Sequence, residues 1–140
     1  VLTGLENCYL YGSLLGFSRT EMRQLLPAIF STAGVSSFKH TKLKYYSTGM
    51  KARLGFSVMI NVKPDVMVLD EIFTVGDKDF KPFCERKLRE FKDAGKTILL
   101  ASHSEKLLTS FCDRLLCLEE GKIVRQGKPD QVLAYYNKHV

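Results

Sequence analysis

The chain has 140 residues, of which 45% are hydrophobic and 26% charged, and its formal net charge is +6. This composition is typical of a globular domain and argues against a disordered chain. No apolar run reaches the roughly 18 residues that a membrane-spanning helix needs. Lys and Arg are scattered rather than grouped into a run that could follow nucleic-acid phosphates, so we expect no nucleic-acid partner.

The first third of the chain is predicted to be helical. Apolar residues recur at helical spacing over 5–14, and the pattern ends near Gly16. Ser18 and Glu21 have the spacing of a capping box, and the second helix that they open ends at Gly34.

A connector with a basic end is expected over 35–46, and a third helix follows it. Ser47 is a suitable N-cap, and Pro64 marks the far limit of this helix. The apolar residues of this helix that suit one buried face are Met50, Leu54 and Val58.

After Pro64 short apolar runs alternate with helical patterns. Strands are predicted at 66–69, 97–101, 114–118 and 123–125, and helices at 80–91, at 105–111 and from Pro129 onward. The first two strands are continuously apolar, which predicts burial on both faces. The alternation indicates parallel βαβ units, so we expect an α/β fold with a helical lobe at 1–61 and a sheet that lacks strands at 62–140.

The four cysteines are Cys8, Cys84, Cys112 and Cys117. None forms a CxxC pair, and none has metal-ligand spacing with histidine. We expect them to be reduced thiols within apolar regions of a cytosolic protein.

Two acidic residues, Asp70 and Glu71, follow the first predicted strand directly. Ligands of open parallel sheets bind at the carboxyl ends of the strands. A carboxylate there can hold Mg²⁺, and a second one beside it can polarise an attacking water. A strand that ends in a solvated acidic turn fits the same residues, and the run alone does not decide between them.

His103 follows the second predicted strand, one βα unit after the acidic pair. An imidazole at this edge can donate a hydrogen bond to a terminal phosphate oxygen and so sense its presence. A single histidine is more often structural or merely exposed, and the matching position of His103 is what favours a functional role.

The start of the third helix combines Ser47, Thr48 and Gly49. A helix N-terminus offers free N–H groups and a partial positive charge to an anion, and glycine lets a phosphate approach the backbone. Taken alone, an ordinary capped helix explains these residues better.

Two further sequences need separate interpretations. Asp77 lies six residues beyond Glu71 and could either cap the next helix or contribute to a site. Gly95, Lys96 and Thr97 look like the end of a GxxxxGK[ST] phosphate loop, but position 90 is Glu and a strand rather than a helix is expected to follow. We interpret them as a helix C-cap.

Taken together, the order of these elements resembles the ATP-binding subunit of an ABC transporter over nearly the whole chain. The resemblance implies a partial P-loop NTPase (RecA-like) parallel sheet with an ABC-type α-helical subdomain. Residues 1–61 would be the helical subdomain with the signature helix, and 62–140 the C-terminal part of the catalytic core. ATP and Mg²⁺ are the implied ligands.

The resemblance also implies roles for single residues. Asp70 looks like the Walker B aspartate that holds Mg²⁺, Glu71 like the catalytic glutamate that activates water, Asp77 like the D-loop aspartate, and His103 like the switch histidine. The reaction would be attack of water on the γ-phosphate of ATP.

The signature motif of the family is matched by Ser47, Thr48 and Gly49, with Thr48 in place of the first glycine of the common form. These residues would bind the γ-phosphate of ATP that a second copy of the subunit holds, in a head-to-tail dimer.

Three stretches are similar to polysaccharide exporters in particular: Leu-Thr-Gly-Leu-Glu-Asn at 2–7, Tyr-Ser-Thr-Gly-Met at 46–50, and Val-Gly-Asp at 75–77. That group exports lipid-linked O-antigen, teichoic acid or capsular polysaccharide. The similarity implies a peripheral protein at the cytoplasmic face of the membrane that works with a membrane permease.

The Walker A loop and Q-loop of the family would lie before Val1, so we expect a piece of a longer chain that is inactive as an ATPase by itself. Two other hypotheses remain. The chain could be a fragment that binds a permease without hydrolysing ATP. It could also belong to an ABC-type ATPase with another substrate, such as DNA, which the net charge favours and the missing coiled-coil heptads disfavour.

Overall fold

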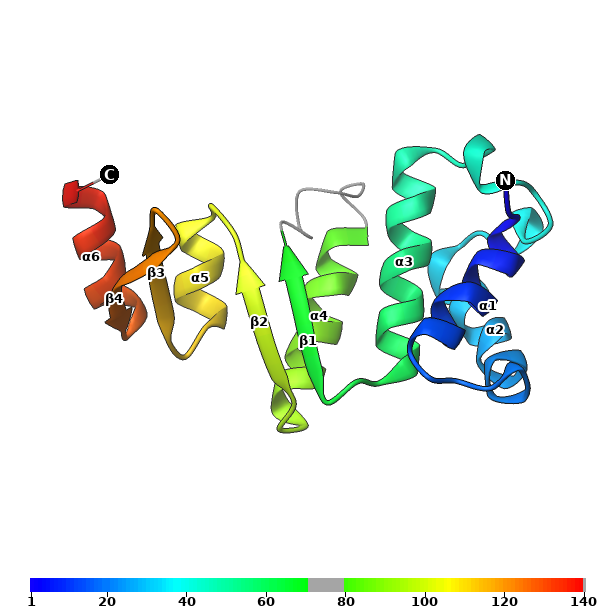
Figure 1. Cartoon of the computed structure of the whole chain (residues 1–140), viewed down its shortest axis with the longest axis horizontal. Coiled ribbons are helices and arrows are strands. Elements are labelled where there is room, and N and C mark those ends of the chain that lie inside the picture. The colour runs from blue at the N-terminus through cyan, green and yellow to red at the C-terminus, as the bar shows by residue number, and fades with distance from the viewer. Residues whose placement is uncertain (71–79, 140) are drawn as a thin grey trace. The chain divides into compact units, whose positions relative to one another are not determined.

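The computed structural model describes residues 1–70 and 80–139 (Figure 1). Helices and strands follow one another in the predicted order. The helices are α1 (Gly4–Leu14), α2 (Arg19–Ala33), α3 (Thr48–Val62), α4 (Phe80–Asp93), α5 (Glu105–Phe111) and α6 (Pro129–His139), with short 3₁₀ turns η1 (Ser36–Phe38) and η2 (Leu43–Tyr45). The strands are β1 (Val66–Asp70), β2 (Thr97–Ala101), β3 (Leu115–Glu119) and β4 (Lys122–Gly127).

The described chain divides into two compact units. The first contains residues 1–67 and 80–98, and the second contains 68–70 and 99–139. The division between a helical lobe and a catalytic core at residues 61 and 62 stays a prediction.

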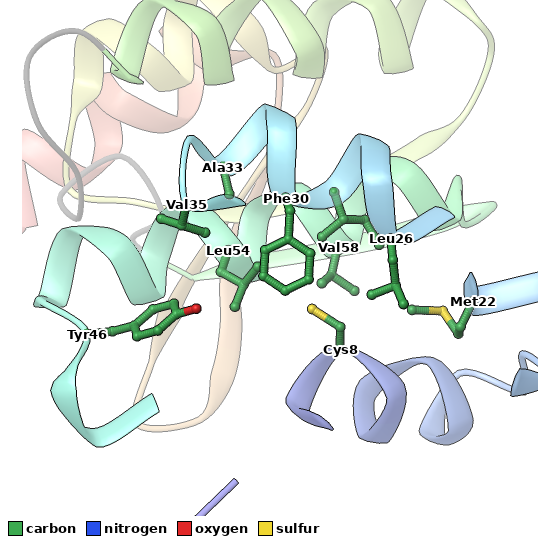
Figure 2. Packing of buried hydrophobic residues seen from close by; sticks show 10 residues of the cluster. Cys8, Met22, Leu26, Phe30, Ala33, Val35, Tyr46, Leu54 and Val58 are labelled. Carbon is green, nitrogen blue, oxygen red and sulfur yellow. The ribbon is translucent and has the colours of Figure 1, made fainter. Parts of the chain in front are cut away.

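Helices α1, α2 and α3 enclose a core of their own in the first unit. Figure 2 shows Cys8 of α1 pointing toward Phe30 of α2 within this cluster. Its buried members are Cys8, Met22, Leu26, Ile29, Phe30, Ala33, Val35, Tyr46, Leu54 and Val58. The expected capping box of α2 is confirmed, because Ser18 accepts a hydrogen bond from the Glu21 N–H and the Glu21 side chain accepts one from the Ser18 N–H.

The buried face of α1 is made of small residues rather than of its leucines. Gly4, Cys8 and Gly12 are buried, whereas Leu10 and Leu14 are 46% and 75% exposed. A Cβ atom added to Gly12 would lie 2.3 Å from the Met22 side chain. Glycine therefore allows α1 to pack closely against α2.

Helix α4 is anchored to α3 by aromatic rings, also within the first unit. The Phe56 and Phe80 rings meet edge to face with centroids 5.7 Å apart, and the Arg53 guanidinium lies 5.0 Å from the Phe80 centroid. At the other end of α4, Gly95 adopts a left-handed conformation with φ of 74°, and β2 follows. The interpretation of Gly95 as a C-cap is thereby confirmed.

Strands β1 and β2 are hydrogen-bonded neighbours, and their arrows point the same way in Figure 1. The prediction that both faces are buried is wrong. Met67 is 2% exposed, but its neighbour Val68 is 69% exposed, and Leu99 of β2 is 56% exposed. Such alternation arises when a sheet is covered on one face only. The apolar sequence of a strand indicates a preference for burial, but it does not show whether another layer covers each face.

The second unit contains an antiparallel hairpin of β3 and β4, against which α6 packs. Leu115 and Cys117 of β3 are buried with Val132 of α6. The alternate side chains Leu118 and Ile123, which pair across the hairpin, are 66% and 56% exposed. This sheet is also covered on one face.

None of the four cysteines is in a disulfide bond, which agrees with the expected reduced thiols. Three are buried, whereas Cys112 is half-buried. Burial raises the pKa of Cys8 to about 12 and that of Cys84 to about 11, so both thiols stay protonated at neutral pH. Within 1–70 and 80–139, no helix has the length and apolar character needed to cross a bilayer.

Candidate functional site

Asp70 is the last residue of β1 and is exposed. The alternation of the strand explains its orientation: Met67 and Leu69 are buried on one face, so Asp70 continues the exposed face. The Asp70 carboxylate thus lies at the carboxyl end of a strand that is held in place by the buried side chains Met67 and Leu69.

His103 lies two residues beyond the end of β2 and is also exposed. The turn around it is held by local hydrogen bonds, because Ser102 Oγ accepts from the Ser104 N–H at 3.2 Å. Ser104 in turn caps α5 by accepting from the Leu107 N–H at 3.4 Å. His103 is therefore carried by a short ordered turn between a strand and a helix.

Because β1 and β2 are neighbours that run in the same direction, Asp70 and His103 lie at the same edge of the sheet (Figure 1). The carboxylate at this edge offers a hard oxygen ligand to a cation, and the imidazole offers a hydrogen-bond donor to an anion bound beside that cation. The functional roles of both residues stay predictions.

The donor set at this edge fits a magnesium ion. Mg²⁺ prefers oxygen ligands and is usually held by one or two carboxylates, with waters and substrate phosphates completing the shell. The exposed Asp70 carboxylate meets this requirement. Among residues 1–70 and 80–139, no three His, Cys, Asp or Glu side chains form a group that could hold a metal ion.

Two of the predicted site residues, Glu71 and Asp77, lie outside the described residues. Glu71 follows Asp70 directly in the sequence, and the proposals for both residues depend on sequence and resemblance alone.

The remaining candidates, Ser47, Thr48 and Gly49, lie at the start of α3 in the first unit. Ser47 is the N-cap, with its Oγ accepting a hydrogen bond from the Met50 N–H at 3.1 Å. The hydroxyl proton of Ser47 stays available, since a serine hydroxyl can donate one hydrogen bond while it accepts another. Ser47 and Thr48 are both exposed.

Gly49 has no packing reason to be glycine in this structure. A Cβ atom added there would meet only Ser47 Oγ, at 3.9 Å. The space around the first turn of α3 is thus open, and the first N–H groups of a helix have no partner within the helix. This helix start can approach an anion without rearrangement.

Tyr46 belongs to the Tyr-Ser-Thr-Gly-Met stretch, but no separate role was predicted for it from the sequence. It is 3% exposed, and its hydroxyl donates a hydrogen bond to the Phe38 carbonyl at 2.7 Å. Burial raises the pKa of Tyr46, with a smaller contribution from Cys8. The ring also fills the space above Gly4, where an added Cβ would lie 2.2 Å from the Tyr46 oxygen.

The buried Tyr46 side chain therefore anchors the backbone directly before Ser47 in the helical core. The sequence signal was the aromatic residue directly before an N-cap, although the hydrophobic staple that often begins at this position has no apolar partner here, because the fourth helical position is Lys51.

No protein-family model matches the chain. Curated proteins match it over nearly its whole length. It is 40% identical over 135 residues to the teichoic acids export ATP-binding protein TagH of Bacillus cereus, covering 96% of this chain and 25% of that protein. The TagH protein of Staphylococcus haemolyticus is 39% identical over 137 residues, or 98% of this chain and 52% of that protein. The ABC transporter protein AbcA of Aeromonas salmonicida is 41% identical, covering 97% and 44%.

Solved structures share the fold. The ATP-binding subunit of an ABC transporter superposes with a TM-score of 0.81 at 23% identity, covering 97% of this chain and 57% of the other. An ADP- and phosphate-bound dimer of the ATP-binding cassette MJ0796 gives a TM-score of 0.74 at 21% identity, covering 92% and 57%. The expected α/β fold is thus confirmed. The chain spans between a quarter and about half the length of the curated relatives named above.

Proposed function

We infer from the membership of this chain in the family of ABC-transporter ATP-binding proteins that its residues form part of the site at which the complete subunit binds and hydrolyses ATP. The observation that carries this proposal is the common edge of β1 and β2 that holds Asp70 and His103. Both residues are exposed there, and neither is needed to fill the core.

The chemistry proposed for this edge divides between three side chains. Asp70 would hold Mg²⁺, which would neutralise phosphate charge. Glu71 orients a water molecule and accepts its proton as the water attacks the γ-phosphorus, while the bond from this phosphorus to the β–γ bridging oxygen breaks and ADP leaves with the electron pair. His103 donates a hydrogen bond to a γ-phosphate oxygen, where charge develops in the transition state. Catalysis of this kind depends on positioning and charge rather than on covalent steps.

The start of α3 is proposed to act on ATP held by a second copy of the subunit. Ser47 can donate its hydroxyl proton to a phosphate oxygen while its oxygen stays engaged with Met50. Thr48 and Gly49 add backbone N–H groups at the positive end of the helix. A head-to-tail dimer, in which Asp77 also contributes, would bring this helix start to the partner's nucleotide.

The transported substrate is proposed from the relatives. Several of them are named as teichoic acids export ATP-binding proteins, which supports export of a lipid-linked polysaccharide. We propose that the complete subunit sits at the cytoplasmic face of the membrane and works with a permease.

The 140 residues contain no GxxxxGK[ST] loop. We therefore propose that the chain by itself does not turn over ATP, and that hydrolysis needs the longer subunit. A nucleotide titration distinguishes this part of an ATPase from a fragment that only binds a permease. If the chain is part of an ATPase, the longer subunit should bind ATP and the chain alone should not.

The decisive experiment replaces Glu71 by glutamine in the complete subunit. Glu71→Gln keeps the size and polarity of the side chain but removes the base, so kcat should fall by at least about a hundredfold. The Kd for ATP should change less than about threefold, because binding depends on other residues.

Glu119→Gln at the exposed end of β3 makes the same chemical change away from the site and should leave kcat unchanged. Hydrolysis by Glu71→Gln at a rate close to that of the unchanged subunit would show that Glu71 is not the base.

A further inference from the structure

One part of the sequence has a strongly positive net charge because it lacks acidic residues. Residues 22–64 contain no Asp or Glu at all. Their Lys and Arg residues are Arg23, Lys39, Lys42, Lys44, Lys51, Arg53 and Lys63. The nucleotide site accounts for none of the three lysines between positions 39 and 44.

Three of these lysines share one edge of the first unit with exposed apolar side chains. We call this surface the basic edge and define it by Leu2, Phe38, Lys39, Lys42, Lys44 and Tyr45. The lysines are exposed, and Leu2, Phe38 and Tyr45 are 43%, 45% and 68% exposed. In Figure 1 this edge lies where the segment between α2 and α3 passes the start of α1.

Backbone hydrogen bonds hold the basic edge together. An antiparallel bridge joins Thr3 to Lys42. Next to it, the Leu43 N–H donates to the Leu2 carbonyl at 2.9 Å, and the Leu5 N–H donates to the Lys39 carbonyl at 2.9 Å. The two parts of the edge, far apart in sequence, therefore form one surface whose backbone does not need to be ordered on binding.

Lysine and aromatic side chains are interleaved on this surface. Lys44 Nζ lies 4.7 Å from the centroid of the Tyr45 ring. Glu6 is an acidic neighbour, and one of its carboxylate oxygens accepts hydrogen bonds from the Thr3 N–H at 2.7 Å and the Thr3 hydroxyl at 2.8 Å. Hydrogen bonds from Thr3 and, to a smaller extent, the charge of Lys42 lower the pKa of Glu6.

We propose that the basic edge binds directly to the surface of a bilayer that contains anionic lipids. Lysines are attracted to the negative headgroups, while the exposed rings and Leu2 enter the boundary between headgroups and acyl chains. This interaction goes beyond the proposed ATPase function and uses none of its residues, so either can fail without the other.

Nucleic acid is the competing anion, and the surface fits it less well. The three lysines fall within six positions, which is too short to follow a phosphate backbone over several nucleotides. Leu2 has no role in base stacking, whereas an aliphatic side chain beside lysines and aromatic rings is typical of surfaces that lie in a membrane interface.

The test measures cosedimentation of the whole chain with vesicles of phosphatidylcholine alone and of phosphatidylcholine with about one-third phosphatidylglycerol. We expect binding to the anionic vesicles only, and weaker binding at higher salt. The triple variant Lys39→Gln, Lys42→Gln and Lys44→Gln should lose at least about tenfold in affinity, since each lysine near such a surface contributes about 1 kcal/mol.

The matched control is Lys122→Gln, Lys128→Gln and Lys138→Gln, which removes the same charge from exposed positions of the second unit. It should bind the vesicles as the unchanged chain does. Equal losses in both triple variants, or no loss in the first, would overturn the proposal. So would tighter binding to a single-stranded RNA than to the vesicles through the same three lysines. Tyr45→Ser should weaken vesicle binding by about threefold, because one apolar contact is lost.

Discussion

The helical part of the first unit and the second unit differ in how completely they bury their apolar side chains. Helices α1, α2 and α3 bury ten residues in a core that they enclose themselves. In the second unit, the cluster between the β3–β4 hairpin and α6 has three buried members, and Leu118 and Ile123 remain exposed on the other face of the hairpin. The apolar sequence of a strand therefore does not mean that the strand is covered in this chain.

This contrast indicates where the stability of the chain arises. In the helices, each buried side chain contributes its full transfer and packing free energy. In the strands, every second apolar side chain contributes little, because it stays in water. Substitutions should therefore have unequal effects in the two regions even when they remove the same atoms.

The largest effect is expected from Ile29→Ala in α2. Ile29 is 0% exposed, so its truncation removes buried methylene groups and leaves a cavity, costing about 3 to 4 kcal/mol. Hydrogen exchange of the α2 amides under native conditions measures this loss within the helices alone, which matters because two compact units need not unfold together.

Leu118→Ala is the matched change in the second unit, since Leu118 is 66% exposed. It should alter exchange in β3 by less than about 0.5 kcal/mol. Comparable losses at Ile29 and Leu118 would contradict the contrast between a closed helical core and an open strand face.

A middle-sized effect is expected at the aromatic anchor before α3. Tyr46→Phe keeps the ring but removes the hydroxyl that donates to the Phe38 carbonyl, which keeps its hydrogen bond from the Thr41 N–H; the loss of one hydrogen bond should cost about 1 to 1.5 kcal/mol. Thermal unfolding followed by circular dichroism measures the change. The neighbouring Tyr45→Phe is the control, because the Tyr45 side chain is largely exposed; an equal shift in both variants would rule out the anchoring role.

The smallest effect is expected at the capping box of α2. Ser18→Ala should cost about 1 kcal/mol, because the Glu21 N–H loses its acceptor. Hydrogen bonds from Ser18 lower the pKa of Glu21 below its ordinary value of 4.5. The stability that this carboxylate contributes is therefore present above pH 4.5 and is lost as the pH falls through the lower folded pKa.

Urea unfolding of the unchanged chain and of Ser18→Ala at several pH values measures this dependence. The difference between the two proteins should shrink below pH 4.5, and a difference that grows there would contradict the assignment.

Most of the fold could be predicted from local signals in the sequence. The Ser18 and Glu21 pair, the left-handed Gly34 and Gly95, and the apolar run before Asp70 each encode a helix end or a strand within a few residues. The position of Asp70 and His103 at one edge followed from the order of strands and helices, because parallel neighbours place their carboxyl ends together.

Two features could not be predicted, and both concern distant contacts. The buried face of α1 consists of Gly4, Cys8 and Gly12, which a hydropathy pattern ranks below the leucines of the same helix. The exposure of Val68 depends on whether another layer covers its face, and the strand sequence carries no information about that. Local propensity determines the elements, whereas their packing depends on partners remote in the chain.

The contacts of the Tyr46 side chain connect the beginning of α1 with the beginning of α3. The Tyr46 ring packs against Gly4 at the beginning of α1, and the Tyr46 hydroxyl donates a hydrogen bond to the Phe38 carbonyl. The next residue, Ser47, is the N-cap of α3. A displacement of the first turn of α1 would therefore press on the Tyr46 ring, which lies one residue before the N-cap of α3.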